Sequence, residues 1–171
     1  LIVRADETSK RMLAPKKCHT GFIWTFRARI PQPLVLYRFA ASRSGETPRD
    51  VLGGTKGFLV VDAYSGYNDV VGVDGRTRVG CHAHARRYFF DAKDSVPEAS
   101  FKALDFILGL YRVEHEARTA GILGTAEHLA LRKARSAPIR AAMHTWLKRE
   151  QPKHAPKSPM GVAIRYTLNQ W

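Results

Sequence analysis

The sequence predicts an α/β protein in which a sheet-forming core, residues 1–82, is followed by a helical region, residues 83–171, that continues the same core. β-branched and aromatic residues gather in short runs before residue 82, which is typical of strands. After that point, apolar residues recur every three or four positions, which is typical of amphipathic helices. The 171 residues are enough to form a real hydrophobic core.

Five strands are expected in the first half. They cover residues 1–5, 20–28, 33–40, 57–61 and 77–81. The segment 28–33 contains two prolines and is interpreted as a hairpin connection. Short helices are expected near residues 49–52 and over 64–70. The unbroken apolar run at 57–61 is typical of a strand that is buried on both faces.

The second half carries three apolar stripes at helical spacing, around residues 85–92, 104–111 and 139–146. A serine followed closely by proline predicts a helix start at Ser136 and another at Ser158. The segment between the last two helices, residues 151–159, is rich in helix breakers and predicts a loop.

The expected order is three strands, a helix, a strand, a short helix, a strand and then helices. Antiparallel strands linked by a hairpin come first, and a parallel strand reached through a helix comes next. This is the order of a ribonuclease H-like domain. In that architecture the metal-binding acids lie on the first and fourth strands, where Asp6 and Asp62 fall.

Asp6 and Asp62 each follow an apolar run directly. A carboxylate at the rim of a buried sheet must be solvated, paired or bound to a cation. Two such groups at neighbouring strand ends are suited to Mg²⁺, which binds a few carboxylates and keeps several waters. The alternative is that each aspartate ends its strand and meets solvent.

The net charge of +13 and the pI of about 10.2 favour a polyanionic partner, most often nucleic acid. The densest region is residues 128–165, where Glu150 is the single acid among the basic residues. The candidate DNA-binding cations, which would contact phosphates without reading sequence, are Arg86, Arg87, Arg135, Arg140, Lys148, Lys153 and Lys157.

Cys18 and Cys81 are the two cysteines, which favours a reducing cytoplasmic compartment. With His82 and His84, Cys81 suggests a zinc site to which Cys18 and His19 could contribute. The spacing lacks the paired zinc-finger signature, so a buried cysteine is the default interpretation. His84 is also a candidate for contacting phosphate near the metal site.

Several stretches of the chain resemble the DDE transposases of the insertion-sequence 66 family. The most specific are Asp62-Ala63-Tyr64-Ser65-Gly66-Tyr67-Asn68 and Cys81-His82-Ala83-His84-Ala85-Arg86-Arg87, and others run from Ala5-Asp6-Glu7-Thr8 to Tyr166-Thr167-Leu168-Asn169-Gln170-Trp171. The resemblance implies a catalytic core that cuts and joins DNA with two Mg²⁺ or Mn²⁺ ions. It maps the first two catalytic acids onto Asp6 and Asp62. His82 stands where the family normally has tryptophan.

The resemblance also places the third acid, a glutamate in an asparagine-rich motif, beyond Trp171. The chain is therefore expected to be an inactive piece of a longer enzyme. Glu114 and Glu116 are the candidates for a third acid within it, whereas Glu7 should face away from Asp6 and form a salt bridge. The expected partners are transposon ends and target DNA, with self-association on the DNA and no membrane, in the bacterial cytoplasm at the nucleoid.

Two other functions are consistent with the same residues. The first is a ribonuclease H-like nuclease or junction resolvase, which would cleave DNA without joining it. The second is a basic DNA-binding remnant of a transposase, which would bind DNA with or without Mg²⁺ and cleave nothing.

Overall fold

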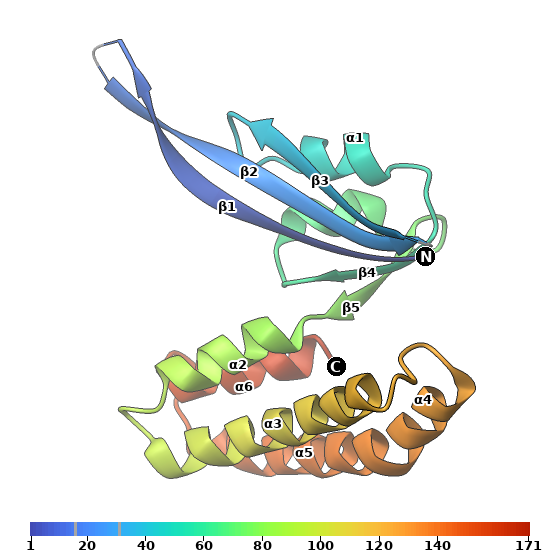
Figure 1. Cartoon of the computed structure of the whole chain (residues 1–171). Coiled ribbons are helices and arrows are strands. Elements are labelled where there is room, and N and C mark those ends of the chain that lie inside the picture. Colours follow the sequence, from blue (N-terminus) through green and yellow to red (C-terminus); the bar gives the residue numbers. More distant parts are fainter. Residues whose placement is uncertain (16, 31) are drawn as a thin grey trace. The chain divides into compact units, whose positions relative to one another are not determined.

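The structure, a computed structural model, describes residues 1–15, 17–30 and 32–171. The chain divides into two compact units, Leu1–Cys81 and His82–Trp171, which are described separately below. The first unit holds all the strands of the described residues, and the second consists of helices (Figure 1).

The first unit is a mixed five-stranded sheet with two short helical segments. Its elements are β1 (Ile2–Ala14), β2 (Lys17–Ile30), β3 (Gln32–Ala40), α1 (Glu46–Leu52), β4 (Gly57–Val61), the 3-10 helix η1 (Ser65–Val70) and β5 (Arg76–Gly80). The strand order is β3-β2-β1-β4-β5. β1, β2 and β3 pair antiparallel, whereas β4 pairs parallel with both β1 and β5. The α/β class and the mixed sheet are therefore confirmed.

One face of this sheet carries the core of the first unit. Trp24 on β2 and Leu59 on β4 are fully buried, and Leu52 of α1 and Tyr67 of η1 belong to the same cluster. The run at β4 was expected to be buried on both faces, which is wrong. Its side chains alternate, and Phe58 is 50% exposed.

The β1–β2 hairpin is longer than predicted. β1 was expected to end at residue 5 but runs from Ile2 to Ala14, 13 residues in all, so Asp6 lies inside the strand instead of at its end. The extra residues are polar up to Arg11 and lack an apolar alternation, so the sequence pattern did not reveal them. The expected connection at 28–33 is mostly strand, because β2 runs to Ile30 and β3 starts at Gln32. Residue 31 itself lies outside the described residues.

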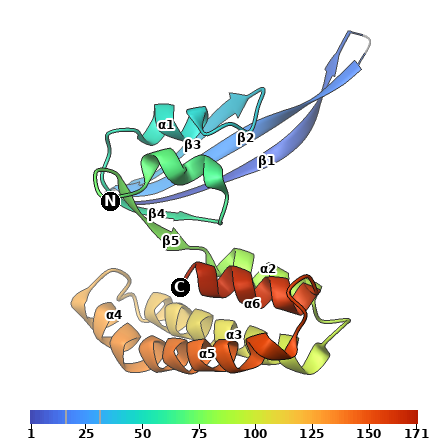
Figure 2. The same ribbon diagram turned by 180° about the vertical axis from the view of Figure 1, so that it is seen from behind.

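The second unit is a helical array around its own core. Its elements are α2 (His82–Asp91), α3 (Pro97–Thr119), α4 (Ala126–Leu131), the π-helical turn η2 (Arg132–Ser136), α5 (Ala137–Glu150), the 3-10 helix η3 (Gln151–Lys153) and α6 (Pro159–Asn169). Phe89, Ile107 and Ile164 meet in the core, because the apolar stripes of α2, α3 and α6 face one another. Figure 2 shows α6 beside α2 and α5 beside α3.

The two predicted helix starts have different outcomes. The hydroxyl of Ser158 accepts a hydrogen bond from the Gly161 N–H at 3.1 Å, which makes it a true N-cap and confirms the start of α6. The start at Ser136 is wrong. Ser136 has helical backbone angles, and the helix continues from α4 through the π turn into α5. Pro138 has no backbone N–H to donate, and the helix nevertheless continues through this residue.

Candidate active site

Asp6 lies within β1, and Asp62 directly follows the last residue of β4, the strand that pairs parallel with β1. The pairing of β1 with β4 aligns Ile2 with Phe58 and Arg4 with Val60. Two residues further along each strand, the same offset aligns Asp6 with Asp62. The backbone pairing itself ends at Arg4 and Val60, so each acid comes two residues after the last paired position.

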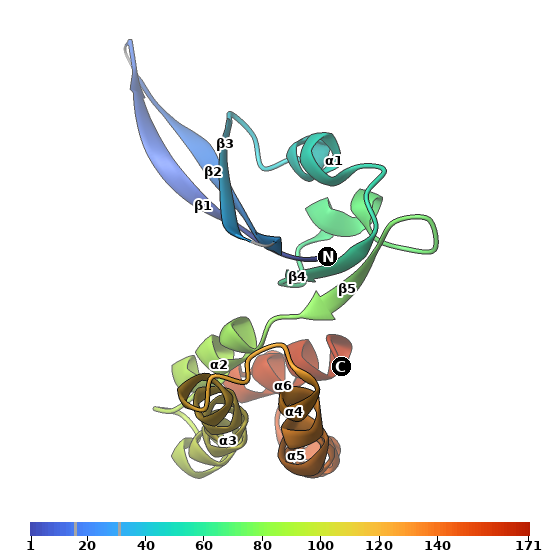
Figure 3. The same ribbon diagram turned by 45° about the vertical axis from the view of Figure 1, so that its right-hand side comes forward.

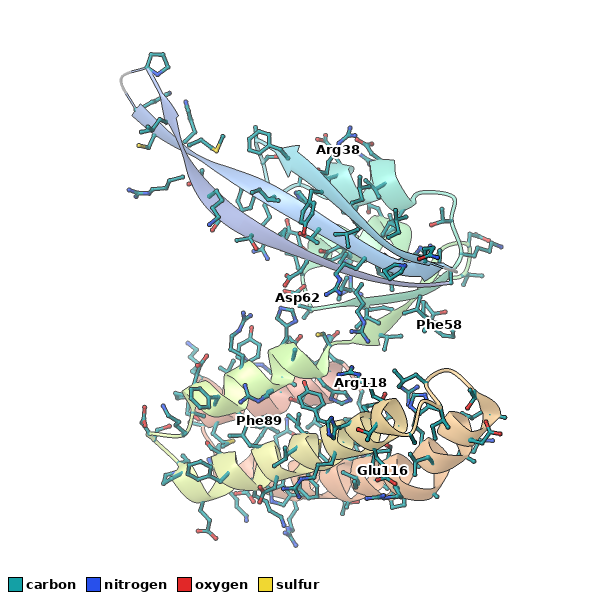
Figure 4. The ribbon with its side chains drawn as sticks, viewed as in Figure 1. Arg38, Phe58, Asp62, Phe89, Glu116 and Arg118 are labelled. Atoms are coloured by element: carbon teal, nitrogen blue, oxygen red, sulfur yellow. The ribbon has the colours of Figure 1, made fainter. Side chains whose placement is uncertain are left out.

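Side-chain alternation predicts that both aspartates belong to the same face of the sheet. Side chains alternate along a strand. Val3 and Ala5 on β1 and Val61 on β4 are buried in the core face, so Asp6 and Asp62 belong to the opposite face. Asp6 is exposed and Asp62 is partly exposed, and the latter is labelled in Figure 4. From the strand pairing and the alternation, we expect the two carboxylates to lie at one level and on one face.

Local hydrogen bonds orient the segment that carries Asp62. One carboxylate oxygen, Oδ1, accepts from the Tyr64 N–H at 2.9 Å. The guanidinium of Arg78 on β5 donates to the Asp62 carbonyl at 3.2 Å, the Tyr64 carbonyl at 3.3 Å and Asn68 Oδ1 at 2.9 Å. Arg78 therefore attaches the loop after β4 to the neighbouring strand. On β1, Asp6 Oδ1 accepts from the Glu7 N–H at 3.1 Å.

Glu7 lies on the core face, directly next to Asp6 in the chain. Its side chain is only 2% exposed and forms an ion pair with Arg43, whose Nε lies 2.7 Å from Glu7 Oε1. The Tyr67 hydroxyl donates to Glu7 Oε2 at 2.8 Å. The expectation that Glu7 is a salt-bridge partner is confirmed. Arg43 and Tyr67 are residues that the sequence did not reveal, because they lie far from Glu7 in the chain.

Aromatic rings enclose this ion pair. The Arg43 guanidinium lies 4.0 Å from the centre of the Tyr64 ring, and the Tyr64 hydroxyl donates to the Arg43 carbonyl. Trp24 packs edge-on against Tyr67 with ring centres 5.7 Å apart. Burial and the nearby Glu7 carboxylate raise the pKa of Tyr67, so its hydroxyl stays protonated and remains a hydrogen-bond donor.

We define the Glu7 cluster as Glu7, Arg43, Tyr64 and Tyr67. It lies on the core face of the sheet and connects the segment that carries Asp6 with the segment that carries Asp62. It contacts β1 next to Asp6 and, through Tyr64, the loop that begins at Asp62. Because the β1–β4 backbone pairing has already ended there, these side-chain contacts maintain the spacing of the two strands beside the candidate site.

The arrangement of the His, Cys, Asp and Glu side chains does not support the zinc interpretation. Across the part of the chain that the structure describes, no three His, Cys, Asp or Glu side chains gather closely enough to hold a metal ion. Cys18 is exposed on β2, so the default of a buried cysteine is wrong for it, and Cys81 is partly buried. His82 and His84 start α2, and burial together with Arg140 lowers the pKa of His82.

Glu114 and Glu116, the acids considered as a third ligand, both form ion pairs within the helical unit. Arg132 donates to both Glu114 oxygens at 2.6 Å, and His128 Nε2 lies 3.3 Å from Glu114 Oε2. The hydrogen bond from Arg132 is the main cause that lowers the pKa of Glu114. Glu116 pairs with Arg135. These contacts join α3 to the turn η2, which is a structural role.

The predicted DNA-binding cations are all exposed residues of the helical unit. They lie on α2 (Arg86, Arg87), η2 (Arg135), α5 (Arg140, Lys148), η3 (Lys153) and the loop before α6 (Lys157). Arg135 and Lys153 are also engaged in ion pairs, the latter with Glu150 at 2.9 Å. The Arg140 guanidinium lies 5.3 Å from the centre of the Trp171 ring.

The fold and the residues above define a class, namely an α/β sheet unit with a paired carboxylate site followed by a basic helical unit. Within the described residues, no helix has the length and apolar character needed to cross a membrane. The chain belongs to the IS66 family of transposases, because the family model described as "Transposase IS66 family" matches residues 1–171.

Curated relatives come from Sinorhizobium fredii. The uncharacterized protein y4hP is 30% identical over 99% of this chain and 34% of its own length. The uncharacterized protein y4qI is 32% identical over 98% of this chain and 34% of its own length. The uncharacterized protein y4jD is 29% identical over 81% of this chain. The chain thus spans about a third of the length of the first two relatives. No solved structure matches.

Proposed function

We propose that this chain is the catalytic core of a DNA transposase, which hydrolyses a phosphodiester bond and joins the resulting 3′-hydroxyl to target DNA. The observation that carries the proposal is that Asp6 lies on β1 and Asp62 directly follows β4, the strand that pairs parallel with β1. Membership of the IS66 transposase family supports it.

We also propose that the first unit has a ribonuclease H-like fold. The order β3-β2-β1-β4-β5 supports this, because it combines three hairpin-linked antiparallel strands with a parallel strand reached through α1. The acids then lie on the first and fourth strands of the chain.

The donor set suits a divalent cation. Carboxylate oxygens are the ligands that Mg²⁺ and Mn²⁺ prefer, and Asp6 and Asp62 would hold the ion. When bound, such ions would activate the attacking hydroxyl and stabilise the leaving oxygen in an in-line displacement. Since Glu114 and Glu116 already pair with arginines, we propose that the third carboxylate comes from a part of the transposase outside residues 1–171.

The surface charge supplies the second part of the proposal. The exposed cations of the helical unit would contact DNA phosphates, which gives affinity that falls with salt and carries little sequence information. The Glu7 cluster would keep the strands that carry Asp6 and Asp62 at a constant spacing. We also propose that the transposase self-associates on the DNA, since joining two ends to a target requires several active sites.

A gel assay on the full-length transposase that carries this chain tests the function. We expect labelled transposon-end DNA to be cut and joined to target DNA in the presence of Mg²⁺ or Mn²⁺, and neither product to form with EDTA. Residues 1–171 alone should form neither product, because the third carboxylate is outside them.

Each other result of this assay has a definite meaning. Cleavage without joined products would identify a nuclease or resolvase and refute strand transfer. Binding without cleavage by the full-length protein would identify a DNA-binding remnant. Cleavage by residues 1–171 alone would place a third acid inside the chain.

A further inference from the structure

β1 and β2 continue beyond the rest of the sheet as a two-stranded ribbon. β4 pairs with β1 only up to Arg4, and β3 pairs with β2 only from Phe22 onward. The β1–β2 pairing nevertheless continues to Ala14 and Lys17. We call residues 9–15 and 17–21 the ribbon. Figures 1 and 3 show it extending past the end of β3.

The base of the ribbon is anchored by apolar contacts. A Cβ at Gly21 would lie 2.5 Å from Cε2 of Phe39 and 3.3 Å from Cγ of Met12. The Phe39 ring and the Met12 side chain therefore pack closely over Gly21, which only a glycine permits. This packing connects the ribbon to the edge strand β3 and gives it a defined starting direction.

The ribbon is basic. Residues 8–21 contain four Lys or Arg residues and no Asp or Glu. Lys10, Arg11 and Lys17 are exposed. By the alternation of β1, Lys10 lies on the face that carries Asp6. Lys17 lies on that face too, because Gly21, four residues further along β2, is directly opposite Lys10.

The dimensions suit a nucleic-acid duplex. At about 3.3 Å per residue, Lys10 lies about 13 Å along the strand from Asp6, and Ala14 about 26 Å. A duplex rises about 3.4 Å per base pair, so the stretch of β1 from Asp6 to Ala14 spans roughly eight base pairs. The major groove admits a two-stranded ribbon, and the twist of such ribbons lets side chains of both faces approach phosphates.

We propose that the ribbon is a DNA-binding arm whose lysines and arginine contact the phosphate backbone of the duplex next to the Asp6–Asp62 site. The occupant is duplex DNA because the ribbon offers cations without any acid, which is complementary to a polyanion. The inference rests on the proposed function in one respect, namely that DNA is the substrate of that site. It adds a contact surface in the sheet unit to the cations of the helical unit.

The test compares two triple variants of the 171-residue chain. The ribbon variant carries Lys10→Ala, Arg11→Ala and Lys17→Ala. The control carries Lys56→Ala, Arg112→Ala and Arg118→Ala, which removes the same charge from exposed positions elsewhere. Fluorescence anisotropy with a duplex of arbitrary sequence gives the affinity over a salt series, and circular dichroism verifies folding.

The ribbon variant should bind at least about tenfold more weakly at low salt, and its salt slope should fall by about 2 to 3, since each lost phosphate contact removes about 0.9. The control slope should change by less than about 1. If the wild-type chain binds DNA but the two variants have equal salt slopes, only the proposal of a DNA-binding arm is overturned. A wild-type chain that does not bind DNA would overturn the proposed function as well.

One further outcome concerns protein partners. Leu13 near the tip is 94% exposed and could instead contact a second copy of the chain. Sedimentation of the two variants distinguishes this case. If the ribbon variant keeps the wild-type salt slope but loses self-association, the ribbon is a protein-binding arm and the proposal is wrong.

Discussion

Asp62→Asn should lower the metal-dependent DNA cleavage of the full-length transposase by roughly a thousandfold or more. That loss corresponds to about 4 kcal/mol of transition-state stabilisation. The amide keeps the shape of the side chain, and its oxygen can still accept from the Tyr64 N–H, so the loop after β4 should keep its conformation. Only the negative charge is removed, and that charge is what a divalent cation requires.

Asp74→Asn is the matched control for this variant. Asp74 is an exposed aspartate of the same unit, and it lies in the loop before β5, away from the Asp6 strand. The control should cleave at the wild-type rate, and both variants should bind DNA with the wild-type affinity to within a factor of a few. An Asp62→Asn enzyme that cleaves normally would show that Asp62 is not part of the catalytic site.

Removing the buried carboxylate of the Glu7 cluster should give the largest loss of stability. Glu7→Ala leaves the buried Tyr67 hydroxyl without its acceptor and removes the partner of Arg43. An unsatisfied buried group costs about 1–3 kcal/mol. Arg43 is 44% exposed and can turn to solvent, so the loss of the ion pair adds only a little. We expect the free energy of unfolding of the first unit to fall by about 2–3 kcal/mol.

Native-state hydrogen exchange at the amides of Phe26 and Leu59 measures this change in the first unit without interference from the helical unit. Tyr67→Phe should lower the free energy of unfolding by less, about 1 kcal/mol, because Glu7 still pairs with Arg43. Glu98→Ala, an exposed residue in the first turn of α3, should leave the exchange of these amides unchanged. A Glu7→Ala protein with wild-type exchange at Leu59 would show that the cluster does not support the sheet.

The sequence predicted the parts of the fold that depend on local patterns. The limits of β4 coincide with its apolar run, and the N-cap of α6 follows from Ser158 and the proline after it. β1 was predicted too short because its outer half is held by pairing with β2, and no apolar alternation marks a ribbon that meets solvent on both faces. The helix break expected at Ser136 did not occur because a π turn continues the helix.

Individual residues of the candidate site could be predicted from the sequence, but their arrangement could not. Asp6, Asp62 and the salt-bridging nature of Glu7 could be inferred from their positions in strands. Their alignment on one face depends on the parallel register of β1 with β4, which joins segments about 56 positions apart and is set by the whole sheet. Arg43 and Tyr67 complete the Glu7 cluster from 36 and 60 residues away, and no local pattern marks them.

Paramagnetic broadening by substoichiometric Mn²⁺ tests directly whether Asp6 and Asp62 share a metal ion. In the NMR spectrum of the 171-residue chain, the backbone amides around Asp6 and Asp62 should broaden together, weakly but selectively, because two carboxylates hold the ion. Asp62→Asn should abolish the broadening at both positions, including that at Asp6. Broadening that appears elsewhere, or that persists at Asp6 in the Asp62→Asn protein, would contradict a shared metal site.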